Sequence, residues 1–112
     1  MAKVIGMVRK RADMTHAEFR DYWLNRHSRL EKESLASNPV RRIVANFWVE
    51  NMVGEVGFDG MVELYYDSIE DLRRVWGSGH DDTMRADEAN FCDPDFRVFC
   101  IVDEVEIGRS AA

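Results

Sequence analysis

The feature that most constrains the fold of this chain is a pair of capped helical segments set among segments with strand patterns. The first helix starts at Thr15, which can cap a helix N-terminus while Glu18 reaches back to its amide. Bulky side chains then recur at helical spacing on one inward stripe, at Phe19, Trp23, His27 and Leu30. The pattern predicts a helix over about residues 15–34, ending before Ser37-Asn38-Pro39.

The second helical segment is capped at Ser68 and should break at residues 77–79, before a short helix resumes over about 82–91. Strand patterns cover residues 3–9, 42–50, 58–67 and 96–107, and a turn at 93–95 precedes the last strand. The resulting order, βαββαβ, is the split arrangement of ferredoxin-like folds. It predicts an α+β protein whose four-stranded sheet carries helices on one face only.

Length and charge narrow the class of protein. The 112 residues form one expected domain, 1–112, with a loose tail at 108–112. Fifteen basic against twenty-one acidic residues give a net charge of −6, which disfavours nucleic acid and anionic membranes as partners. No apolar run approaches the roughly 20 residues of a membrane span. The N-terminus leads straight into a strand pattern without a signal peptide, so the expected location is cytoplasmic.

The sequence offers little for a metal or cofactor. Cys92 and Cys100 can form one disulfide or stay as two free thiols, and a reducing compartment favours the thiols. The spacings CxxC, HxxxH and HExxH do not occur, and no glycine-rich loop opens a helix to hold phosphate. We therefore expect a protein without metal or organic cofactor.

The strand faces predict a dimer. One side of the third strand carries Phe58, Gly60, Val62, Leu64 and Tyr66, and the other carries Asp59, Met61, Glu63 and Tyr65. Both sides are too apolar for water, so a second subunit should cover the face without helices and form a homodimer. We assign the purely apolar side to the dimer, which turns the mixed side toward the helices. That side is then either a small-molecule pocket or a core with satisfied polar groups.

His27 is the most distinctive single residue, because it lies on the inward stripe of the first helix. A histidine there can shuttle protons near neutral pH, or it can be a core residue bonded to the backbone. Glu63 and Asn46 share the side assigned to the helices, and Asp87 follows the apolar stripe of the last helix. We therefore expect His27, Asp87 and Glu63 to be catalytic. The expected substrate-binding residues, whose alternative is ordinary core packing, are Asn46, Tyr65, Trp48, Trp76 and Trp23.

Three motifs resemble those of the EthD family. Residues 10–27 are similar to its signature, a basic turn followed by M-(S/T)-x-x-E-F and Y-W-x-x-x-H. Residues 58–68 resemble its F-D-G-x-x-E-L-W-F-D-S strand, and residues 87–93 resemble its D-E-x-x-F-x-D segment. The resemblance spans roughly residues 3–105. It implies a dimeric α+β barrel, in which two sheets pack face to face and each subunit has a pocket between sheet and helices.

The resemblance also implies a chemistry. Relatives include polyketide cyclases, muconolactone-type isomerases and EthD-type dehydratases, which move protons on cyclic or enolisable substrates without a cofactor. The family's acid–base histidine corresponds to His27, although Ser28-Arg29-Leu30 replaces the usual Gly-Pro-Leu after it. Arg29 there would suit an anionic substrate or lie at the surface. We expect a lyase or isomerase; the alternatives are a non-catalytic binding protein and a monooxygenase of the same barrel superfamily.

Overall fold

The computed structural model describes residues 2–76 and 80–109, with the side chains of residues 80 and 81 excepted. The predicted helix break at 77–79 and the end of the predicted tail lie outside this part. Its elements are β1 (Ala2–Lys10), α1 (His16–Tyr22), the π-helical turn η1 (Trp23–His27), α2 (Ser28–Ser37), β2 (Val40–Phe47), β3 (Gly60–Tyr66), α3 (Ile69–Trp76), α4 (His80–Glu88) and β4 (Cys92–Asp103). The predicted α+β class and βαββαβ order are confirmed.

The first helical stretch runs without a gap from α1 through η1 to α2, three residues beyond its predicted end. The predicted capping box is present: the Glu18 amide donates to Thr15 Oγ1 at 3.1 Å, and the Thr15 amide donates to Glu18 Oε1 at 3.0 Å. Asn38 ends the stretch in an extended conformation, as expected for a residue before proline. Local capping and breaking signals thus account for both ends.

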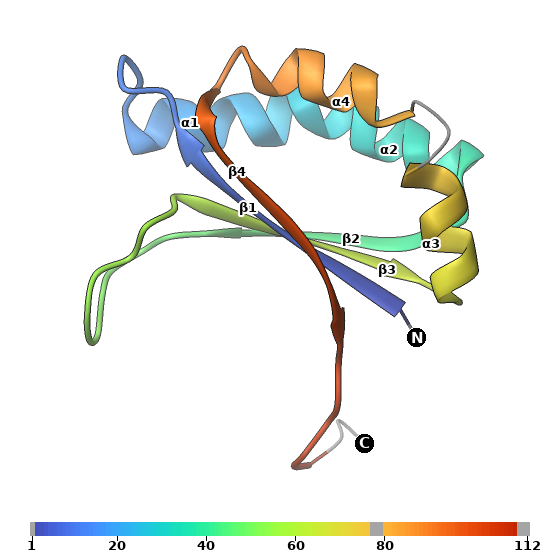
Figure 1. Cartoon of the computed structure of the whole chain (residues 1–112). Helices are drawn as coiled ribbons and strands as arrows, with labels where there is room; N and C mark the ends of the chain where they lie inside the picture. The colour runs from blue at the N-terminus through green and yellow to red at the C-terminus, as the bar shows by residue number, and fades with distance from the viewer. Residues whose placement is uncertain (1, 77–79, 110–112) are drawn as a thin grey trace.

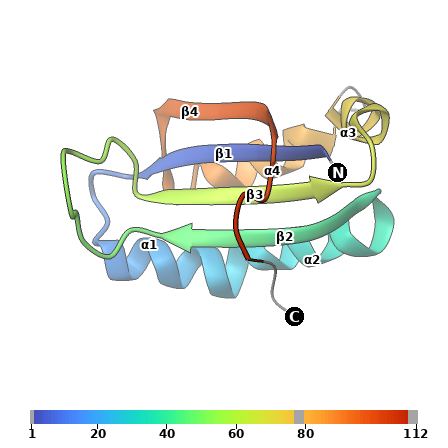
Figure 2. The ribbon, with the colours of Figure 1, turned by 90° about the horizontal axis from the view of Figure 1, so that it is seen from below.

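The four strands form one antiparallel sheet in the order β2-β3-β1-β4. All the helices lie on one face of this sheet (Figure 1). Seen from below, the strands lie in front of the helix layer, and the chain beyond β4 lies in front of the sheet (Figure 2). The loop between β2 and β3 and the segment after β4 both extend away from the helix layer (Figure 1).

β4 begins four residues earlier than predicted. Cys92 pairs with Lys10, and the register then shifts so that Arg97 pairs with Val8. The predicted turn is therefore a bulge inside the strand, where the Asp95 amide donates to Asp93 Oδ1 at 2.9 Å. The bulge lets the chain enter the sheet directly after α4.

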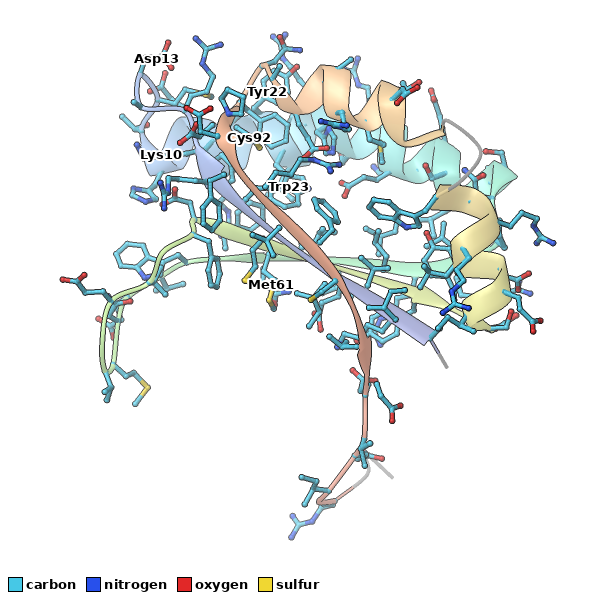
Figure 3. All side chains as sticks on the ribbon, viewed as in Figure 1. Lys10, Asp13, Tyr22, Trp23, Met61 and Cys92 are labelled. Atoms are coloured by element: carbon cyan, nitrogen blue, oxygen red, sulfur yellow. The ribbon has the colours of Figure 1, made fainter. Side chains whose placement is uncertain are left out.

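The predicted assignment of the two sheet faces is wrong. The purely apolar side of β3, with Val62, Leu64 and Tyr66, lies beneath the helices. The mixed side, with Met61, Glu63 and Tyr65, faces away from them. The apolar residues of the helices, such as Phe19 and Leu72, require an apolar surface to pack on, and the first side is the more apolar of the two. Figure 3 shows Trp23 between helices and sheet and Met61 at the other side of the sheet.

Aromatic residues fill the space between α1 and the sheet. Phe19 and Phe91 are 1% exposed and lie with ring centroids 5.6 Å apart. The helix comes so close to β3 that a Cβ atom at Gly60 would lie 2.7 Å from Trp23 Cζ3. The glycine in the Phe58-Asp59-Gly60 motif is therefore explained by close approach of the helix.

Both cysteines are free thiols, as predicted, with Cys92 buried and Cys100 exposed. Within the described residues, none of the helices has the length and apolar character needed to cross a membrane.

Candidate active site

A cavity of about 70 Å³ lies between the apolar side of the sheet and the helices. Its sheet side is apolar and includes Val62, Leu64 and Phe99. Its polar lining residues come mainly from the helices: His27, Glu31, Ser34, Asn38, Glu88 and Arg97. The sheet thus supplies an apolar floor, and the helices supply most of the groups capable of chemistry.

The π-helical turn η1 explains why residues four apart along the first helical stretch all reach this cavity. In an α-helix, residues four apart are rotated by about 40°, so a stripe with that spacing drifts off one face. Here the Ser28 amide donates to the Trp23 carbonyl, five residues back, which widens the turn. Trp23, His27 and Glu31 therefore all line the cavity although each is four residues from the next.

His27 and Asp87 form a hydrogen-bonded pair at one side of the cavity. His27 is 6% exposed, and its Nδ1 lies 2.8 Å from Asp87 Oδ2. Asp87 Oδ1 accepts from the Tyr22 hydroxyl at 2.8 Å and from the Asn90 amide at 3.2 Å. Partial burial favours the protonated form of Asp87, but these three hydrogen bonds outweigh it and hold its pKa below the ordinary value. An ionised Asp87 therefore orients the imidazole.

The second ring nitrogen of His27 is left for the cavity. Nε2 has no hydrogen-bond partner among the described residues. Every fully buried side-chain polar atom in that part of the chain does have a partner, so Nε2 is not fully buried. Since His27 lines the cavity, Nε2 reaches its open space. A group held on one nitrogen by a carboxylate and open on the other can take up and return a proton.

Two further carboxyl groups line the cavity, in different surroundings. Glu88 is 8% exposed and forms a forked ion pair with Arg97, with nitrogen–oxygen distances of 3.1 and 3.2 Å. Glu31 is also 8% exposed, and its Oε1 accepts from Trp23 Nε1 at 3.0 Å. Burial raises the pKa of Glu31, and the nearby His27 and the Trp23 hydrogen bond offset this rise only in part.

The structure brings together half of the eight predicted site residues. His27, Trp23 and Trp76 line the cavity, and Asp87 lies directly behind His27. The Trp76 ring packs on Phe99 with centroids 5.3 Å apart. These four residues make a site with an aromatic wall and one proton-transfer group.

The other four predicted residues lie elsewhere, so their expected place beside His27 is wrong. Glu63 lies on the open side of the sheet, 2.6 Å from Lys3 Nζ, and accepts from Asn46 Nδ2 at 3.0 Å. The Tyr65 hydroxyl donates to Glu104 at 3.2 Å in the same network. Trp48 is partly exposed at the start of the β2–β3 loop, and its ring packs on His16. For the three strand residues the cause is the reversed face assignment, because neighbouring residues of a strand point to opposite sides, whereas Trp48 lies beyond the end of β2.

Glu31, Glu88 and Arg97 were not predicted. One signal for Glu31 was present: it follows His27 by four residues, and so continues the spacing that relates Phe19, Trp23 and His27. Glu88 and Arg97 come from α4 and β4, and their pairing depends on where the bulge places the start of β4. Arg29 is exposed and does not line the cavity. Among the described residues, no group of three or more acidic, histidine or cysteine side chains is placed to hold a metal ion.

Comparisons with solved structures show the same fold in several proteins. A Bacillus halodurans C-125 protein of the ethyl tert-butyl ether D (EthD) family matches with a TM-score of 0.73 and 23% identity, over 94% of this chain and 99% of that one. A dimeric, ferredoxin-like protein of unknown function from Bacteroides fragilis NCTC 9343 matches with a TM-score of 0.64 and 14% identity, over 92% and 95%. A proposed antibiotic biosynthesis monooxygenase from Nitrosomonas europaea matches with a TM-score of 0.63 and 14% identity, over 95% and 100%.

A comparison with curated proteins found no significant match. The model of the EthD domain matches residues 11–95, which include both the Tyr22-Trp23 to His27 motif and the Asp87 segment. The chain therefore belongs to the EthD family.

Proposed function

We propose that the protein is a cofactor-independent lyase or isomerase in which His27 moves a proton on a small cyclic or otherwise enolisable carbonyl compound. The observation that carries this proposal is the buried His27–Asp87 pair, whose free imidazole nitrogen reaches an apolar, aromatic cavity. Dehydration, cyclisation and isomerisation of such compounds share one step, the removal of a proton beside a carbonyl group. The site has the parts for this step.

In this step His27 Nε2 takes the proton from the carbon beside the carbonyl group. The electron pair of the broken C–H bond forms a carbon–carbon double bond, and the carbonyl π electrons move to oxygen. Asp87 fixes the imidazole tautomer through Nδ1 and stabilises the imidazolium that forms. Tyr22 and Asn90 hold Asp87 in place. Glu63, Asn46 and Tyr65 take no part, because they lie on the other side of the sheet.

Two other functions fit the same cavity. A binding protein that holds a hydrophobic metabolite needs the aromatic walls but not a histidine that transfers protons. A monooxygenase is suggested by the relative from Nitrosomonas europaea, and it would consume oxygen. Oxygen uptake and proton exchange therefore separate the three.

The test is deuterium exchange from heavy water into acetophenone, 1-indanone and cyclohexanone, followed by mass spectrometry. The wild type should accelerate exchange into at least one ketone, and His27→Gln should lower that rate by about 10² to 10⁴-fold. Melting temperatures of both proteins check that the variant is folded. Equal rates for the two proteins would contradict the proposal and favour a binding role, and ketone-dependent oxygen uptake would favour the monooxygenase.

We also infer that the protein is a homodimer through the open side of the sheet. This side carries partly exposed apolar residues, including Ile5, Met7, Val44, Met61 and Val98. The Bacteroides fragilis relative with this fold is described as dimeric. Sedimentation equilibrium should give about twice the 13.0 kDa chain mass, and a single chain mass at micromolar concentration would contradict the inference.

A further inference from the structure

A buried carboxyl group, Glu31, shares the cavity with His27 but has no part in the step described above. We propose that Glu31 is held as a neutral carboxylic acid that donates a hydrogen bond to the carbonyl oxygen of an uncharged ligand. The group thereby selects neutral carbonyl compounds over carboxylates. The binding part of this proposal stands on the cavity alone, and its catalytic part rests on the proposed function of His27.

The position of Glu31 leaves one of its oxygens for a ligand. Oε1 accepts the Trp23 indole hydrogen at 3.0 Å. Oε2 has no hydrogen-bond partner among the described residues. Every fully buried side-chain polar atom there does have a partner, so Oε2 is not fully buried. Because Glu31 lines the cavity, Oε2 reaches the open space into which His27 Nε2 also opens. A ligand in the cavity can therefore meet both atoms.

The charges around the cavity explain why Glu31 is neutral. Glu88 is neutralised by Arg97, and Asp87 is paired with His27. Glu31 has no basic group within ion-pair distance in the described part of the chain, although it is almost fully buried. Burying an unpaired carboxylate is costly, and a carboxyl group in that situation takes up a proton instead. The upward direction of the Glu31 pKa agrees with this reasoning.

The same arrangement selects the kind of ligand. The O–H of a carboxylic acid needs an acceptor oxygen, which a ketone, an ester or an amide supplies. A carboxylate ligand would bring a further negative charge into an apolar cavity. The Arg97 guanidinium that lines it already forms an ion pair with Glu88. Arg29, which suggested an anionic substrate, is exposed and does not line the cavity. The cavity therefore suits an uncharged carbonyl compound.

Glu31 also completes the proton transfer. As His27 removes the proton beside the carbonyl group, the oxygen that gains the electron pair takes the proton of Glu31. The products are an enol, an imidazolium and the Glu31 carboxylate, and returning both protons restores the starting groups. An apolar site that keeps a carboxylic acid neutral is a known means of stabilising such an oxygen.

The first test reads the protonation of Glu31 without any ligand. The infrared difference spectrum of wild type minus Glu31→Gln at neutral pH should contain the carbonyl stretch of a protonated carboxylic acid. Glu31→Gln is a close match in shape and keeps an acceptor for the Trp23 indole. Carboxylate bands in its place, as an ion pair of Glu31 with a protonated His27 would produce, would overturn the proposal.

The second test compares benzamide with benzoate, which have the same shape but differ in charge, by calorimetry. Wild type should bind benzamide at least about 10-fold more tightly than benzoate. Glu31→Leu should weaken the binding of benzamide by about 2- to 10-fold, because one hydrogen bond is lost. Glu31→Gln retains an N–H donor and should bind benzamide nearly as well as wild type. Tighter binding of benzoate, or unchanged benzamide binding by Glu31→Leu, would overturn the proposal.

The outcomes also separate this proposal from the proposed function. If the infrared band and the preference for benzamide are found but no ketone exchanges deuterium, the enzymatic function fails and the donor role of Glu31 stands. If exchange depends on His27 while Glu31 is ionised, the function stands and the role of Glu31 fails.

Discussion

The two faces of the sheet both carry charged side chains, but they use them differently. On the open face, Lys3 is 7% exposed and lies 2.6 Å from carboxylate oxygens of both Glu63 and Glu104. Hydrogen bonds from Lys3 and Asn46 hold the pKa of Glu63 below its ordinary value. These groups are paired with one another within the protein. On the helix-covered face, the groups come mainly from helices, and His27 and Glu31 each keep one atom without a hydrogen-bond partner among the described residues.

The difference separates structural from reactive polar groups. A group whose hydrogen bonds and charge are met inside the protein has little left for a ligand. A group that is buried, positioned by one partner and open to a cavity on its other side can act on a ligand. Polar residues on strands looked like site residues because of their alternation, yet the strands mainly build the floor of the cavity.

The largest expected effect comes from placing the same charge on neighbouring residues of β3. Val62 is buried on the helix-covered side, so Val62→Asp should unfold the chain, because an unpaired charge there costs about 3–5 kcal/mol. Met61 lies on the open side, so Met61→Asp should keep the chain folded but shift the dimer to monomers. Circular dichroism and sedimentation of the two variants measure these outcomes. A folded Val62→Asp protein would contradict the placement of the two faces.

The next effect separates catalytic from structural carboxyl groups. Glu63→Gln should leave ketone exchange near the wild-type rate, although it changes a partly buried network on the open face. His27→Gln should lower the rate by about 10² to 10⁴-fold. If both variants lose activity to the same degree once their folded fractions are equalised, the helix-covered face has no special role.

A smaller effect on stability is expected where α1 approaches the sheet. Gly60→Ala would place a Cβ atom 2.7 Å from Trp23, and the displaced helix should cost about 1–3 kcal/mol in unfolding free energy. Gly57→Ala is the control, since nothing lies within 4 Å of its Cβ position, and it should stay within about 0.5 kcal/mol of wild type. Urea unfolding of both proteins gives the difference. Equal stabilities would show that the close approach of helix and strand is not maintained in solution.

Asp87 should contribute stability that depends on pH. Its folded-state pKa lies below the ordinary 3.8, so its contribution is present above that value and is lost as pH falls through the folded-state pKa. Asp87→Asn should therefore lower the free energy of unfolding by about 1–2 kcal/mol at neutral pH, and its stability should approach that of wild type in acid. Unfolding midpoints measured along a pH series test this. A deficit that grows toward acid would contradict the sign.

The contribution of Glu31 to stability should depend on pH with the opposite sign, and its effect should be the smallest. Its folded-state pKa is raised by burial, so ionising it costs stability as pH rises from the ordinary 4.5 through the folded-state value. Glu31→Gln should therefore be at least as stable as wild type at neutral pH, and its advantage should grow as pH rises. A variant that is less stable than wild type at high pH would show that Glu31 is ionised and paired.

Much of the fold was predictable because its signals are local. Thr15 and Glu18 mark the first helix, Pro39 marks its end, and alternation marks the strands. Alternation could not predict which face of the sheet the helices cover, because it separates the two sides of a strand without showing which side receives the helices. The site followed the same division: His27, Trp23, Trp76 and Asp87 came from helix patterns and lie together, whereas residues chosen from the strand faces do not.

The most direct measurement uses the three tryptophans as reporters of the two regions. Trp23 and Trp76 line the cavity, and Trp48 lies away from it beside His16. Their indole N–H signals can be assigned in a nitrogen-15 NMR spectrum with single Trp→Phe variants and then followed as acetophenone is added. We expect the Trp23 and Trp76 signals to shift together while the Trp48 signal stays in place. A shift of Trp48 with Trp23 and Trp76 unchanged would contradict the claim that the ligand binds between the helices and the sheet.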